Sequence, residues 1–61
     1  MRVYLETLDG TVRALEDRGQ GAFYRTTTDL SRATEFSDAV AKLHVATIEH
    51  YGGQFDAWTE E

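Results

Sequence analysis

The sequence predicts an α+β fold, in which one helix packs on one face of a three- or four-stranded, mostly antiparallel sheet. Three observations predict it. Asp9-Gly10 separates two alternating segments, the strongest short-range signal of a β-hairpin. Residues 37–53 show the periodicity of a helix. Residues 22–28 and 54–59 are β-prone and flank that helix in the sequence. The expected order is therefore β-β-β-α-β.

The hairpin spans residues 2–17, and we expect Asp9 and Gly10 to be its two loop residues. This register places opposite charges across the two strands on one face, as the pairs Glu6 with Arg13 and Arg2 with Asp17. The other face then carries an apolar set for the helix to cover: Val3, Leu5, Val12 and Ala14. A slip of one residue would turn that set toward solvent, so the register is testable.

The charged face of this hairpin also carries three large apolar side chains: Tyr4, Leu8 and Leu15. In a two-layer protein that face is open to water. These side chains are either scattered surface residues or the centre of a contact patch, for example between two copies of the chain.

Two glycines in residues 18–21 indicate a turn, and their spacing does not match a phosphate-binding loop. Residues 22–28 follow as a third strand, antiparallel to the second. A turn at 29–31 and a short irregular bridge through Phe36 lead to the helix. After the helix, residues 54–59 form the final strand, in which Asp56 and Trp58 share one face.

The helix over residues 37–53 begins at Ser37, whose hydroxyl can accept hydrogen bonds from the free N–H groups of the first turn. At 100° per residue one sector of it is apolar. The residues of that sector are Phe36, Val40, Leu43, Thr47 and Tyr51. We expect this sector to pack on the sheet.

Residues 1–61 are too few for more than one domain, and a chain this short buries only about 60% of its unfolded surface. It has no cysteine for a disulfide, so association with itself or with a partner is the expected source of further stability. The apolar runs are too short to span a bilayer, and acidic residues occupy the place of a signal-peptide core. These features predict a cytoplasmic protein.

No catalytic or metal-binding motif is present in the sequence. His44 and His50 are six residues apart on the helix, whereas two helical metal ligands are usually four apart. Ser31 and Ser37 are better explained by a turn and a helix cap. We therefore expect no enzyme activity, no catalytic residue, no metal and no cofactor.

The net charge is −5, and all of the excess lies in the second half of the chain. Residues 1–34 hold five acids and five bases, whereas residues 35–61 hold six acids and a single base, Lys42. The acids are Glu35, Asp38, Glu49, Asp56, Glu60 and Glu61. This asymmetry argues against direct binding of nucleic acid. It indicates either a soluble charged surface or an acidic face that docks on a basic partner, with Tyr51 and Trp58 as aromatic anchors.

The size, the acidic second half and the order of elements resemble those of small phage- or prophage-encoded inhibitors, among them anti-CRISPR proteins. The stretch YRTTTDLSRATEFSDAVA, residues 24–41, is similar to sequences common in such proteins. The resemblance implies an inhibitor that occludes a basic, nucleic-acid-binding surface of a larger complex. No residue matches a defining motif, so no residue's role carries over. The alternative is a homo-oligomeric module whose dimer face is Tyr4, Leu8 and Leu15.

Overall fold

The structure is a computed structural model that describes residues 1–17, 24–52 and 55–61, without the side chains of Tyr24 and Tyr51. The turn expected at residues 18–21 lies outside the described residues. The elements are β1 (Arg2–Glu6), β2 (Val12–Asp17), β3 (Tyr24–Thr27), the 3-10 turn η1 (Leu30–Arg32), α1 (Asp38–Thr47), the π-helical turn η2 (Ile48–Gly52) and β4 (Asp56–Glu60). The strands form one antiparallel sheet in the order β3-β2-β1-β4, which confirms the α+β fold.

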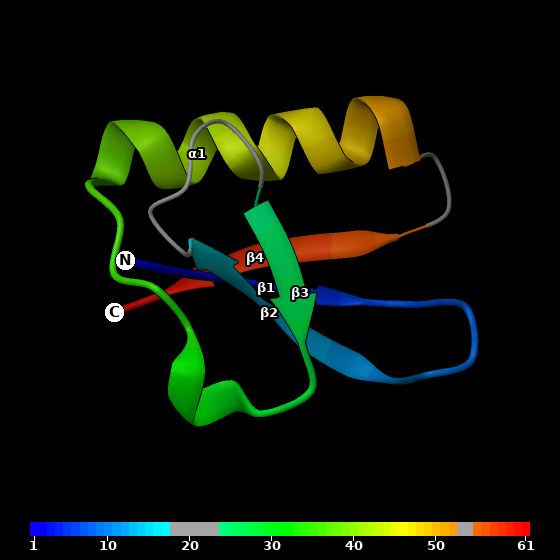
Figure 1. The fold of residues 1–61 in the computed structure, drawn as a ribbon. Helices are drawn as coiled ribbons and strands as arrows, with labels where there is room; N and C mark the ends of the chain where they lie inside the picture. The colour runs from blue at the N-terminus through cyan, green and yellow to red at the C-terminus, as the bar shows by residue number, and fades with distance from the viewer. Residues whose placement is uncertain (18–23, 53–54) are drawn as a thin grey trace.

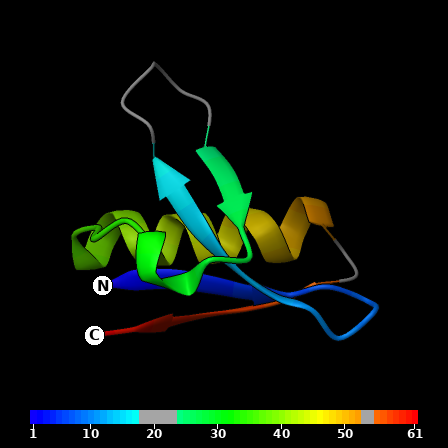
Figure 2. The ribbon, with the colours of Figure 1, turned by 60° about the horizontal axis from the view of Figure 1, so that its bottom comes forward.

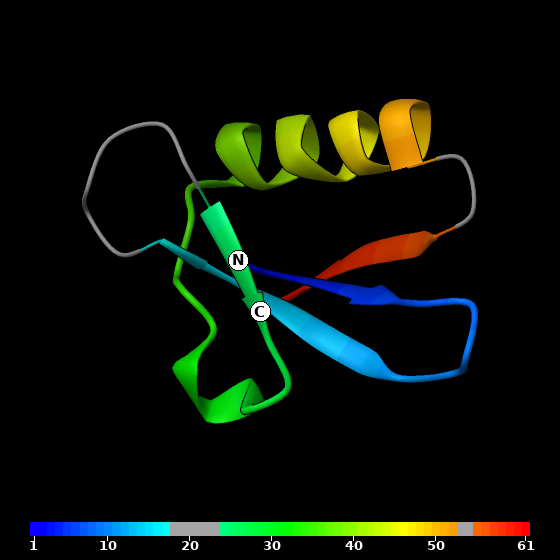
Figure 3. The same cartoon turned by 45° about the vertical axis from the view of Figure 1, so that its right-hand side comes forward.

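Helix α1 crosses one side of the sheet, and η1 lies on the other side (Figures 1 and 3). The two ends of the chain lie side by side, because β4 pairs with β1 along its whole length and places Glu60 opposite Arg2. Figure 2 shows the loop between β1 and β2 at the end of the molecule away from both termini. None of the helices among the described residues is long and apolar enough to cross a membrane.

The β1–β2 hairpin turns at three residues, 8–10, rather than at the two expected. The Thr7 amide donates to the Thr11 carbonyl at 3.0 Å, and the Gly10 amide donates to the Thr7 carbonyl at 2.9 Å. Gly10 has a φ of +85°, whereas Asp9 does not have a positive φ. A two-residue type I′ turn requires positive φ at both central positions. The Asp9 carboxylate instead accepts from the Thr11 amide and the Thr7 hydroxyl, which stabilises the longer loop.

The longer loop shifts the strand register by one residue. The observed pairs are Tyr4 with Ala14, Leu5 with Arg13, and Glu6 with Val12. The predicted charge pairs, Glu6 with Arg13 and Arg2 with Asp17, are therefore wrong. Because side chains alternate between faces, the shift also exchanges the faces of β2. Leu15 lies in the core, and Ala14 and Val12 lie on the opposite face.

The core lies between the sheet and α1. Its buried residues are Val3, Leu5, Leu15, Phe36 and Ala41, with Met1, Val45, Ile48 and Ala57 packed around them. Ala57 of β4 lies directly opposite Leu5 of β1, so its side chain points to the same face of the sheet, toward α1. The predicted set is half correct: Val3 and Leu5 are in the core, and Val12 and Ala14 are not.

Helix α1 begins as predicted, with the Ser37 hydroxyl accepting from the Val40 amide at 3.4 Å. The predicted buried sector is correct at Phe36 but wrong within α1, because Leu43 is 64% exposed and the helix packs on the core through Ala41, Val45 and Ile48. Ala41 and Ile48 each lie one residue, or about 100° around the axis, beyond the predicted Val40 and Thr47.

Phe36 explains the difference in the helix face. It lies before the N-cap and so does not share the rotation of the helix. Its amide donates to the Met1 carbonyl at 2.8 Å, and the Met1 amino group donates to its carbonyl at 2.5 Å. The neighbouring Thr34 amide donates to the Leu15 carbonyl at 3.0 Å. The segment that leads into α1 therefore bridges β1 and β2 beyond their paired residues.

Candidate protein-docking surface

The sheet face opposite α1 carries an aromatic pair near its β4 edge. Trp58 lies opposite Tyr4 in the β1–β4 ladder, and their rings stack with centroids 6.1 Å apart. The indole Nε1 of Trp58 also donates to the Glu60 carboxylate at 3.4 Å. Asp56 and Glu60 share the face of Trp58, because the three residues alternate along β4. We call Tyr4, Glu6, Asp56, Trp58 and Glu60 the acidic aromatic surface.

Glu6 and Asp56 lie directly opposite each other in this surface, and both are exposed. Like charges across a strand pair destabilise the sheet. No cation lies within ion-pair distance of either carboxylate among the described residues. Glu6 was missed at the sequence level, because the expected register paired it with Arg13 within the hairpin.

The Glu60 end of the surface has a different charge balance. Arg2 lies opposite Glu60, and its Nε is 3.8 Å from the Glu35 carboxylate. The terminal amino group of Met1 lies 3.7 Å from the same carboxylate. Two positive charges therefore lie near the Glu60 end of the surface, whereas none of the described ion pairs involves Glu6 or Asp56 at the other end.

Of the eight predicted partner-binding residues, Asp56, Trp58 and Glu60 lie together on the acidic aromatic surface. Glu35 pairs with the N-terminal region, and Asp38 lies in the first turn of α1. Glu49 lies on the α1 side of β4, and Glu61 follows the strand as an exposed residue. Tyr51 belongs to η2, and its side chain is outside the described part of the chain.

The predicted dimer face does not exist as one exposed patch. Tyr4 is 9% exposed and Leu15 is 6% exposed, and they point to opposite faces of the sheet. Leu8 is 74% exposed, in the hairpin loop. The one-residue shift in register moved Leu15 into the core and so separated the three residues.

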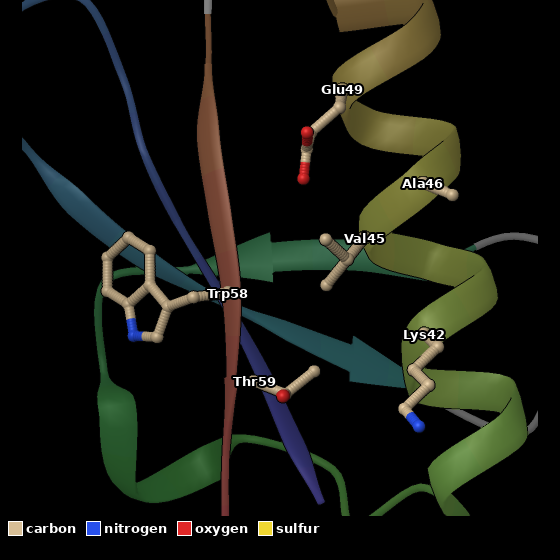
Figure 4. Close-up of a pocket in the computed structure, with 6 residues that line it drawn as sticks. All are labelled: Lys42, Val45, Ala46, Glu49, Trp58 and Thr59. Carbon is tan, nitrogen blue, oxygen red and sulfur yellow. The ribbon is translucent and has the colours of Figure 1, made fainter.

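An open groove of about 500 Å³ runs between α1 and the edge strand β4. Its lining residues are Lys42, Val45, Ala46, Glu49, Trp58 and Thr59. Figure 4 shows Val45 and Glu49 pointing from the helix toward β4, whereas the indole of Trp58 points to the other side of the strand. The groove therefore has Val45 at the centre of its helix wall, between the charged Lys42 and Glu49, and strand β4 opposite it.

A second hollow lies beside the Glu16–Arg32 ion pair, in which Nε and Oε2 are 2.9 Å apart. Glu16 is buried, and Arg32 belongs to η1, so the pair fastens η1 to β2. His44 packs its ring edge-on against Phe36, with centroids 4.9 Å apart. Within residues 1–17, 24–52 and 55–61 no group of three or more His, Asp or Glu side chains could hold a metal ion.

Comparisons with known protein families, with curated proteins and with solved structures give no match to this chain.

Proposed function

We propose that this protein is a non-enzymatic binding domain that docks on a basic surface of a larger protein and occludes it. The surface of a nucleic-acid-binding protein is the partner that best fits this chemistry, because such surfaces are rich in Lys and Arg. The observation that carries the proposal is the exposed pair Glu6 and Asp56, opposite each other beside the stacked rings of Tyr4 and Trp58.

A lysine or arginine of the partner would reduce the repulsion between Glu6 and Asp56. The same cation would lie near the face of Trp58, where the ring quadrupole adds to the attraction. Tryptophan is enriched among residues that dominate binding energy, and the surrounding acids suit the steering of a basic partner. This arrangement favours Trp58 as the anchor and the carboxylates as the source of selectivity.

The experiment measures retention of partners from a bacterial lysate on the immobilised protein at increasing salt. Retention should fall steeply as NaCl rises from about 50 to 500 mM, because salt screens charges on exposed surfaces. Added DNA should compete for the retained proteins if their basic sites are the ones covered.

Two matched double variants locate the docking surface. Asp56→Asn with Glu60→Gln removes two negative charges from the acidic aromatic surface, and Glu35→Gln with Asp38→Asn removes two elsewhere. We expect the first variant to lose most of the salt-sensitive retention and the second to keep it. Equal losses in both would contradict a specific surface, and retention that is indifferent to salt would contradict acid-driven docking.

A second candidate function is a homo-oligomeric interaction module, which the exposed Val40 and Leu43 on α1 favour. Light scattering over a range of concentrations tests it. A dimer that Leu43→Asp dissociates without unfolding would support this candidate. A monomer at all concentrations would exclude it.

A further inference from the structure

Strand β4 is an edge strand of the sheet, so half of its backbone hydrogen-bonding groups have no partner strand. The hydrogen bonds of the β1–β2 hairpin show which backbone groups these are. The Thr7 amide donates toward β2, and the groups of successive residues alternate between the two sides of a strand. Leu5 therefore also turns its backbone groups to β2, whereas Tyr4 and Glu6 turn theirs to β4.

The same alternation assigns the groups of β4. In an antiparallel ladder, two directly opposite residues whose backbone groups point toward each other form two hydrogen bonds, each N–H donating to the other residue's C=O. Trp58 lies opposite Tyr4, and Asp56 lies opposite Glu6, so these two residues use their backbone groups on β1. Ala57 and Thr59 turn their N–H and C=O groups away from β1, toward the open edge.

The groove beside α1 lies along this open edge. The side chains of Ala57 and Thr59 point to the helix side of the sheet. If another chain paired with this edge, its residues directly opposite Ala57 and Thr59 would point to the same side. On that side Val45 is the apolar side chain of α1 that points toward β4, and the charged Lys42 and Glu49 flank it along the groove (Figure 4). The side chains in between would lie on the other face, beside Asp56 and Glu60.

We propose that the β4 edge binds an extended basic segment of the partner protein as a fifth, antiparallel strand. The segment alternates as basic–apolar–any–apolar–basic, with its apolar residues opposite Ala57 and Thr59 and its basic residues opposite Asp56 and Glu60. Strand addition of this kind draws affinity from main-chain hydrogen bonds and specificity from alternate side chains. It rests on the proposed function, since it names how a basic partner would engage this surface.

Charge favours such a segment over a second copy of the chain. An antiparallel β4–β4 pair centred on Trp58 would place Asp56 of one copy opposite Glu60 of the other, twice over. Like charges directly opposite each other are unfavourable, and charged residues are a common protection of edge strands against self-pairing. A basic segment would turn both contacts into attractive pairs.

A synthetic peptide with the core Lys-Val-Thr-Val-Lys, capped at both ends, is the probe. Its control is Val-Lys-Thr-Lys-Val, which has the same composition but directs lysine into the groove. Binding is followed by amide NMR. We expect the probe to bind at least about tenfold more tightly than its control, and to slow hydrogen exchange of the Ala57 and Thr59 amides.

Two changes remove the main-chain contacts alone. Thr59→Pro deletes an outward N–H and leaves the β1 ladder intact, because proline is tolerated on edge strands where the N–H faces solvent. It should weaken probe binding at least about tenfold, whereas Thr59→Ala should not. From the ligand side, N-methylation of the two valines should abolish binding, and N-methylation of the central threonine should preserve it. The peptide pair still discriminates between the outcomes if the proline variant fails to fold.

The results separate the two proposals. Equal, salt-sensitive binding of the probe and its control, lost in the Asp56→Asn, Glu60→Gln variant, would overturn strand addition and keep acid-driven docking. Valine N-methylation without effect on binding would overturn strand addition in the same way. Binding of neither peptide at low salt would overturn strand addition, whereas lysate retention that is indifferent to salt would overturn acid-driven docking.

Discussion

The two faces of the sheet both bury their central residues, but by different chemistry. Under α1, Val3, Leu5 and Leu15 pack against the helix in an apolar core. On the other face Ala14 is 0% exposed and Glu16 is buried as well, beside an ion pair and a stacked aromatic pair. The helix-covered face therefore depends on close packing, whereas the open face depends on paired polar and aromatic groups near its rim. Trp58 and the exposed acids Glu6 and Asp56 lie on the open face, which is the face that we propose for a partner.

The largest effect should come from the helix-covered face. Leu15→Ala would remove a side chain that is almost fully buried in the core and leave a cavity, lowering the free energy of unfolding by about 2–5 kcal/mol. Urea denaturation measures it. Leu8→Ala, the matched truncation at an exposed position, should change stability by less than about 0.5 kcal/mol. Equal effects at the two positions would contradict the observed register.

The open face should respond most to loss of its ion pair. Arg32→Ala leaves the buried Glu16 without the guanidinium at 2.9 Å, and we expect a loss of about 1–2 kcal/mol. This loss is smaller than for a fully buried pair, because the Arg32 side chain is itself exposed to screening. A double-mutant cycle with Glu16→Gln checks the coupling. A coupling near zero would mean that η1 is held to β2 without this pair.

A smaller effect is expected at the aromatic pair. Trp58→Leu keeps an apolar side chain opposite Tyr4 and removes the ring stacking, which is worth about 0.5–1.5 kcal/mol. Partner binding should fall much more than stability, because the indole is proposed as the anchor. If thermal unfolding shows a loss as large as that of Leu15→Ala, Trp58 serves the fold rather than docking.

The sequence predicted the elements of the fold and their order but not the faces of β2 and α1. The signals for a turn at Asp9-Gly10 and a cap at Ser37 are local, and both features are present. The register depended on whether the loop has two or three residues, which hydrogen bonds from Thr7 and Thr11 to Asp9 decide. One residue of error then inverted β2, because strand side chains alternate.

The candidate site was less predictable, because its key contacts join distant parts of the chain. Asp56 and Trp58 were expected on one face of a strand, and that alternation is local. The repulsive pairing of Glu6 with Asp56 and the stacking of Tyr4 on Trp58 require β4 to lie beside β1. No local pattern indicates which strand a final strand will join. The open edge at Ala57 and Thr59 follows from the same pairing.

The hairpin loop at residues 8–10 sets the register of β2, and its hydrogen bonds should make the stability of the protein depend slightly on pH. Hydrogen bonds from the Thr7 hydroxyl, and then from the Thr11 amide, lower the pKa of Asp9 from 3.8 to about 2. Because the folded-state pKa is depressed, the stabilising contribution is complete above about pH 4 and is lost as pH falls through about 2. Asp9→Asn keeps an acceptor oxygen and removes the charge, so its urea midpoint should lie below that of the unmodified protein at pH 6. The two midpoints should converge near pH 2.

Asp29, whose pKa Ser31 also lowers, is present in both proteins, so its contribution to the pH dependence cancels in the comparison. A difference that stayed constant between pH 6 and pH 2 would show that the charge of Asp9 does not hold the three-residue loop, and the shifted register would then need another cause.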